Sequence, residues 1–139
     1  MIFFDTNVIL DILDESRPDH WEAWMLLSAA EQGAIRGCAS SQSLIDAAYI
    51  QTQTHKVPLS EFRVDLRILA DILTVLPIEE GDILSANDSP VPDYEDAAQL
   101  SCAQRNGCEM IVTRDKKFKG YTSVPTMTVR ECYHKLFKE

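Results

Sequence analysis

The sequence lacks long apolar runs, paired cysteines and glycine-rich phosphate loops. No stretch approaches the roughly 18 apolar residues of a membrane span, and Met1 leads straight into a short apolar run, so we expect neither a membrane segment nor a signal peptide. The four cysteines form no CxxC pair and the three histidines lie far apart, which argues against zinc and disulfides. Neither GxxxxGK(S/T) nor GxGxxG occurs, which argues against the common nucleotide-binding loops. These absences favour a cytoplasmic protein with packed, reduced thiols.

Basic residues are also scarce: 13 Lys and Arg stand against 22 Asp and Glu, which gives a net charge of −9. A protein that coats DNA or RNA needs a basic face, so this balance argues against that class. It does not exclude an enzyme that reaches phosphates through bound divalent cations, because the carboxylates that bind such cations add to the negative count. The same charge would attract a basic protein partner.

The apolar pattern alternates between strands and helices, without repeats or linkers, and 139 residues suit a single domain over residues 1–139. Short apolar runs predict strands that end near Asp5 and strands over 34–39, 74–78, 110–113 and 126–129. Helical spacing predicts helices over 6–15, 19–32, 41–50, 59–72 and 93–107, with at most a short helix over 79–88. A last helix is predicted after the strand over 126–129, and it runs to Phe137. Strands separated by helices imply parallel order, so the predicted fold class is α/β, a three-layer αβα sandwich with a central parallel β-sheet.

Four aspartates stand out by position among the acidic residues. Asp5 and Asp115 directly follow apolar strands, and Asp96 lies in the first turns of a predicted helix. Asp46 is embedded in an apolar run, where an unpaired carboxylate would be costly. The carboxyl ends of parallel strands meet at one edge of a sheet. We therefore expect the strands that end at Asp5 and near Thr113 to be adjacent and the acids to share one cleft.

Each acid also has a purely structural interpretation. Asp5 can cap the helix that starts at Thr6, Asp93 and Asp96 suit a helix N-terminus, and Asp115 can fix a turn. Taken together they favour a metal site, because Mg²⁺ and Mn²⁺ prefer oxygen ligands and suit about two to four carboxylates around an open cleft. Such an ion orients phosphate oxygens and lowers the pKa of the attacking water, which predicts phosphodiester hydrolysis.

Four segments in register resemble the PIN-domain ribonucleases, and among them the VapC-type toxins of type II toxin–antitoxin pairs: FFDTNVILDIL, SSQSLIDAAYI, DYEDAAQL and IVTRDKKF. They span essentially the whole chain, so the resemblance implies a single PIN-like domain. It also implies that Asp5, Asp96 and Asp115 bind metal. Thr113 resembles the small hydroxyl residue beside the last acid of the family, and Asn7 resembles the polar residue of its opening motif.

One position departs from the family pattern. The second acid of the family is usually a glutamate, and Asp46 stands in its place. The shorter side chain would contact metal only through water or leave the cleft more open. The departure supports an alternative function, a catalytically silent PIN-like module that binds RNA or protein without metal.

The sequence thus predicts a Mg²⁺- or Mn²⁺-dependent endoribonuclease and, from the resemblance, a toxin held silent by a cognate antitoxin. The residues with predicted catalytic roles are Asp5, Asp46, Asp96 and Asp115, with Asn7, Thr113 and Asp93 in support. The basic residues beside the last acid are predicted to hold the RNA backbone or to form a solvated loop: Arg114, Lys116 and Lys117. The expected partners are RNA, the antitoxin and a second copy of the chain. Trp21 and Trp24 favour core packing or an oligomer contact over base stacking.

Overall fold

A parallel five-strand sheet lies at the centre of the computed structural model, which describes residues 1–114 and 117–137. Its order is β3-β2-β1-β4-β5, and the strands are β1 (Ile2–Phe4), β2 (Gly37–Ser40), β3 (Thr74–Leu76), β4 (Met110–Val112) and β5 (Thr126–Met127). Strand β1 pairs in parallel with both β2 and β4, so Phe4 lies beside Val112 where both strands end. This pairing confirms the predicted adjacency of the strands that end at Asp5 and near Thr113.

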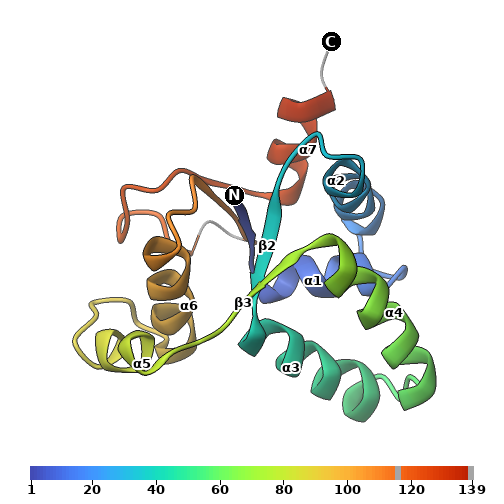
Figure 1. The fold of residues 1–139 in the computed structure, drawn as a ribbon, viewed down its shortest axis with the longest axis horizontal. Coiled ribbons are helices and arrows are strands. Elements are labelled where there is room, and N and C mark those ends of the chain that lie inside the picture. The colour runs from blue at the N-terminus through green and yellow to red at the C-terminus, as the bar shows by residue number, and fades with distance from the viewer. Residues whose placement is uncertain (115–116, 138–139) are drawn as a thin grey trace.

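Helices cover both faces of the sheet, as Figure 1 shows. One face carries α5 (Glu80–Asn87) and α6 (Tyr94–Arg105), and the other carries α1 (Thr6–Leu13), α2 (His20–Glu31), α3 (Ser41–Tyr49), α4 (Leu59–Ile72) and α7 (Val129–Phe137). Successive side chains of a strand point to opposite faces. Phe3 therefore packs into the core on the α5–α6 side, while Ile2 and Phe4 pack into the other core. The predicted three-layer α/β class is confirmed.

Two helices begin directly at the carboxyl ends of central strands. Asp5 ends β1 and caps α1 by accepting the Thr6 N–H, and Ser40 ends β2 and caps α3 by accepting the Ser43 N–H. Asp93 caps α6 in the same way, which confirms its structural interpretation. Because α1 and α3 start at the same edge of the sheet, the first turns of both helices contribute side chains there.

Two local details differ from the expectation. Strand β2 occupies 37–40 rather than 34–39, because the chain still bends at 34 and 35 after Gly33 ends α2 with a φ of 81°. Helix α3 does not stop near residue 50 but continues into a π-helical turn, η1 (Ile50–Thr54), in which the His55 N–H bonds to Ile50 O. This wider turn carries Gln51 into the protein interior.

The cysteines behave as expected. All four cysteines are buried and free, which confirms their packing roles. Of the two alternatives for Trp21 and Trp24, core packing is wrong, because they are 56% and 47% exposed while α2 turns Ala23, Leu26 and Leu27 toward the core. The oligomer contact stays a prediction. Among the residues that the structure describes, no helix is long and apolar enough to cross a membrane.

Candidate functional site

Asp5 lies at the carboxyl end of β1 with 1% of its surface exposed. Its Oδ1 accepts the Thr6 N–H at 2.7 Å, which is the helix cap, and its Oδ2 accepts the Thr113 hydroxyl at 2.8 Å. The helix-cap interpretation of Asp5 is thus confirmed for Oδ1, and the metal-ligand interpretation stays a prediction for Oδ2. One oxygen is fixed by the helix start, and the other faces the site.

Lys117 joins Asp5 to Asp96. Its Nζ lies 2.8 Å from Asp5 Oδ2 and 2.8 Å from Asp96 Oδ1. Burial raises the pKa of Asp96, and the neighbouring ammonium works against that rise. Burial lowers the pKa of Lys117, but the two carboxylates outweigh it, so the pKa of Lys117 lies above its usual value. Carboxylates from β1 and α6 thus converge on one positive charge.

Asp46 lies beside a second acid, Glu95, which sequence reasoning missed although it directly precedes Asp96. Gln42 Nε2 donates to Asp46 Oδ1 at 2.9 Å, whereas the buried Oδ2 has no hydrogen-bond donor in the part of the chain that the structure describes. Hydrogen bonding to Asp46 raises the pKa of Glu95 to about 7, and burial adds to the rise. A proton on Glu95 would supply the donor that Asp46 Oδ2 lacks.

One of the two pairs of acids lines a cavity of about 380 Å³, and Lys117, which contacts the other pair, lines the same cavity. Asp46 and Glu95 line this cavity together with Asn7 and Lys117. Asn7 thus lies beside these acids, and its predicted supporting role stays a prediction.

A buried polar network ties together the three helices that carry the acids. Gln99 Nε2 donates to Ser43 Oγ at 2.8 Å and to Thr6 Oγ1 at 3.3 Å, and the two hydroxyls lie 2.8 Å apart. Sequence reasoning missed Gln99, although it lies three residues after Asp96 and thus on the same face of α6. The network fixes α1, α3 and α6 relative to one another beneath the site.

The carboxylate oxygens of the site suit a hard divalent cation, and within the described residues they come from one pair of aspartates. In residues 1–114 and 117–137, no three His, Cys, Asp or Glu side chains are grouped so as to hold a metal ion. Mg²⁺ needs only one or two carboxylates, because water and substrate phosphate complete its shell. Asp5 and Asp96, already arranged around a cation, meet that requirement. Asp115 and Lys116 lie outside the described residues.

Arg114 contacts a buried acid that sequence reasoning also missed. Its Nη2 lies 3.5 Å from Asp11 Oδ1, and Arg17 Nε contacts the same oxygen at 2.7 Å. Burial raises the pKa of Asp11, and the two arginines work against that rise. Asp11 is embedded in an apolar run like that of Asp46, so the same sequence signal would have found it. The side chain of Arg114 remains 43% exposed and available to a phosphate.

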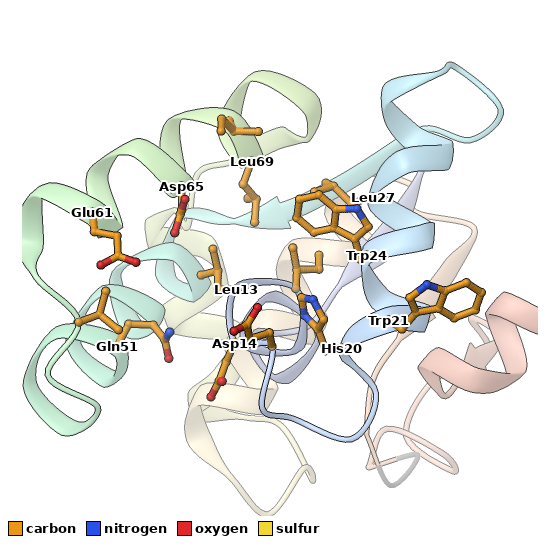
Figure 2. Close-up of a pocket in the computed structure, with 14 residues that line it drawn as sticks. Leu13, Asp14, His20, Trp21, Trp24, Leu27, Gln51, Glu61, Asp65 and Leu69 are labelled. Carbon is orange, nitrogen blue, oxygen red and sulfur yellow. The ribbon is translucent and has the colours of Figure 1, made fainter.

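A second cavity, of about 500 Å³, lies away from Asp5 and Asp96, between α1, α2 and α4. Figure 2 shows Trp24 and Leu27 of α2 facing Leu69 of α4 across it. Its rim is acidic, with side chains from both sides: Asp14, Glu15, Glu61 and Asp65. This groove is lined by the apolar side chains of Leu27 and Leu69 and also by the polar side chains of His20 and Gln51.

A parallel sheet that delivers carboxylates to one edge, flanked by helices on both faces, defines a class of α/β proteins with an acidic cleft. A protein-family model described as the PIN domain matches residues 1–117, and the chain belongs to that family.

Relatives and solved structures agree with this assignment. The chain is 26% identical over 122 residues to Ribonuclease VapC1 of Aquifex aeolicus, with 84% of this chain and 83% of that protein covered. A toxin–antitoxin complex from Klebsiella pneumoniae superposes with a TM-score of 0.65 at 20% identity, over 93% of this chain and 98% of that one. Mycobacterium tuberculosis VapC20, described as a sarcin-ricin loop cleaving toxin, superposes with a TM-score of 0.67 at 14% identity, over 89% and 98%.

Proposed function

We propose that this protein is a Mg²⁺- or Mn²⁺-dependent endoribonuclease and the toxin of a type II toxin–antitoxin pair. The observation that carries the proposal is the convergence of Asp5 and Asp96, from separate elements, on one cationic atom at 2.8 Å each. Two carboxylates held this close repel each other unless a cation lies between them. The family membership and the relative named Ribonuclease VapC1 support the same activity.

The proposed roles follow from the placement of each residue. Asp5 and Asp96 would hold the divalent cation, with Asp46 at the edge of the site. For Asp115, which lies outside the described residues, the role of a further ligand rests on the family resemblance alone. A bound cation would orient the phosphate oxygens, neutralise developing charge and lower the pKa of the attacking water. Thr113 keeps Asp5 Oδ2 oriented through its 2.8 Å hydrogen bond.

The substrate contacts would come from the remaining predicted residues. The exposed side of Arg114 and, with it, Lys116 would contact the RNA backbone, because an arginine fork matches phosphate oxygens. Asn7 lines the cavity beside the acids and would contact a nucleotide bound there. A protein with this activity on cellular RNA would act in the cytoplasm.

An antitoxin segment would occupy the groove between α2 and α4 (Figure 2). Its apolar floor suits aliphatic or aromatic side chains, and its acidic rim suits Lys and Arg. The net charge of −9 favours such a basic partner. The structural neighbour from Klebsiella pneumoniae is described as a toxin–antitoxin complex, which supports an antitoxin partner for this chain.

Self-association would use α3, where Ile45 and Tyr49 lie one turn apart and are 67% and 66% exposed. Two large apolar side chains at this spacing form a continuous patch, and such patches commonly mark protein interfaces.

The test is cleavage of RNA by the antitoxin-free protein with Mn²⁺, with Mg²⁺ and with a chelator. We expect cleavage only with metal, and loss of cleavage in Asp96→Asn, which keeps the size of the side chain but removes its charge. Asp71→Asn, on the exposed face of α4, is the matched control and should cleave like the wild type. A wild type that neither binds divalent metal nor cleaves RNA would overturn the proposal in favour of the silent binding module.

A further inference from the structure

The ammonium of Lys117 occupies the position between the two carboxylates that the proposed function assigns to metal. It is 2.8 Å from an oxygen of each, and 28% of the side chain is exposed. The Phe118 ring, with its centroid 5.6 Å from Nζ, lies on another side of the charge. Lys117 is thus an ordered occupant of the site rather than a surface lysine.

We infer that Lys117 is an internal competitor of the metal: it holds Asp5 and Asp96 together in the metal-free protein and must leave them before a divalent cation can bind. The inference rests on the proposed function, and it assigns to one residue the control of metal loading.

The hydrogen bonds of Asp5 make the two cations mutually exclusive. Asp5 Oδ1 is used by the Thr6 N–H, and Asp5 Oδ2 accepts from both Thr113 and Lys117. A metal–oxygen contact of about 2 Å on Oδ2 would place a divalent ion within a few ångströms of the ammonium. Like charges that close repel strongly in a partly buried site. The metal therefore gains Asp5 Oδ2 only when Lys117 gives it up.

A second place for the displaced ammonium lies in the same cavity. Asp46 and Glu95 line the cavity together with Lys117, and Asp46 Oδ2 is buried with no donor among the described residues. An ammonium that moves toward this pair would donate a hydrogen bond to that oxygen. Lys117 can thus exchange one carboxylate pair for another without entering bulk water.

The need to displace Lys117 lowers the affinity of the site for metal. A ligand that binds only a minor state has its apparent affinity reduced by the population of that state. Minor conformers are commonly populated at about 0.1–10%, so Lys117 would weaken metal binding by about tenfold or more.

The primary experiment measures Mn²⁺ binding by titration calorimetry to the wild type, Lys117→Met and Lys119→Met. The methionine at 117 keeps length and apolar contacts but removes the charge, and the exposed Lys119 controls for the general effect of losing one positive charge nearby. We expect Lys117→Met to bind Mn²⁺ about tenfold or more tightly than the wild type, and Lys119→Met to stay within about twofold.

Without metal, Lys117→Met should also be less thermally stable than the wild type, because Asp5 and Asp96 then lack their cation. On adding Mn²⁺, Lys117→Met should gain more thermal stability than the wild type does. Equal affinities of the wild type and Lys117→Met would overturn the inference and leave the proposed function intact. No Mn²⁺ binding by either protein would instead overturn the metal-dependent function and, with it, this inference.

A measurement on the wild type tests the displacement even if the variant fails to fold. Acetylation of lysines, read by mass spectrometry with and without Mg²⁺, reports on the freedom of each amine. We expect Mg²⁺ to change the modification rate of Lys117, because the ammonium then has different carboxylate partners, and to leave Lys119 unchanged. A Lys117 rate that does not respond to Mg²⁺ under conditions of proven binding would contradict the displacement.

The proposed move of the Lys117 ammonium to Asp46 and Glu95 has its own test. In Asp46→Asn combined with Glu95→Gln, Lys117 loses the alternative carboxylates, so metal binding should weaken several-fold relative to the wild type. The same pair of substitutions in the Lys117→Met background should have a smaller effect. Equal effects in both backgrounds would show that these acids act on the metal directly and not through Lys117.

Discussion

The Thr113 hydroxyl donates a hydrogen bond of 2.8 Å to Asp5 Oδ2, although 108 positions separate the two residues in the chain. Parallel pairing of β1 with β4 creates this contact, because Phe4 lies opposite Val112 and the following residues leave the sheet side by side. Thr113 is fully buried, so its side chain is not accessible at the protein surface. Its hydroxyl orients the oxygen of Asp5 that faces the site.

Replacement of Thr113 by Val should weaken metal binding by about tenfold, the usual effect of losing a group that orients a metal ligand. The change keeps the branched shape and removes only the donor. Thr113→Ser keeps the hydroxyl and serves as the control, with an affinity near that of the wild type. Mn²⁺ titration calorimetry measures both, and identical affinities for Val and Ser would show that the hydrogen bond has no role in the site.

The buried ion pair of Asp82 with Arg105 should make stability depend on pH in the acid range. Asp82 is fully buried, lies 2.9 Å from Arg105 Nη2 and accepts the Ser101 hydroxyl. Burial alone would raise the pKa of Asp82, but Arg105 and the other donors hold it below the ordinary 3.8. The pair therefore stabilises the fold above that pKa and loses its contribution as pH falls through the lower, folded-state value.

We expect Asp82→Asn to lower the free energy of unfolding by about 1–2 kcal/mol at neutral pH, because a neutral amide accepts the hydrogen bonds of Ser101 and Arg105 less strongly than the buried carboxylate does. The deficit should shrink as pH falls below about 4, where the wild type begins to protonate Asp82. Urea denaturation at several pH values measures this, with the exposed Asp71→Asn as the control. A deficit that stays constant down to the most acidic pH would contradict the assignment.

Truncation of Trp24 to Ala should weaken binding of the co-encoded antitoxin by at least about 2 kcal/mol, because half-exposed aromatic side chains in a groove are typical anchors. Charge reversal of Glu61 to Lys should mainly slow association and reduce its dependence on salt. Val64, exposed on α4 outside the groove, provides the control as Val64→Ala. Surface plasmon resonance separates the two rates, and unchanged binding in Trp24→Ala would exclude the groove.

A charge introduced on the exposed face of α3 should break self-association. Ile45→Asp places a carboxylate at the centre of the proposed interface, whereas Val64→Asp places one at an equally exposed apolar position elsewhere. Light scattering at high protein concentration should show a dimer for the wild type and Val64→Asp, and a monomer for Ile45→Asp. A monomeric wild type would rule out the homodimer.

The sequence determined the elements of this fold because their signals are local. Apolar runs of three to five residues and helical spacing predicted the strands and helices, and the caps at Asp5, Ser40 and Asp93 appear where expected. The boundaries at β2 and η1 differed, because the bend after Gly33 and the π-helical turn depend on contacts that periodicity does not report.

The alternation of strands and helices also predicted parallel pairing and the adjacency of the strands that end at Asp5 and near Thr113. The sequence could not predict which side chains each acid contacts. Whether a carboxylate meets a lysine, a hydroxyl or another carboxylate depends on a few ångströms of helix packing, which no residue spacing specifies.

The tertiary structure alone decided three features of the site: Lys117 between Asp5 and Asp96, the contact of Asp46 with Glu95, and the groove lined by Trp24. Each depends on side chains from separate helices meeting at a junction. The sequence by itself determined which residues could supply charge at the sheet edge, because strand ends and helix starts fix their backbone positions. Only packing in three dimensions determined which of those charges neutralise one another, since electrostatic interactions fall off over a few ångströms and depend on burial.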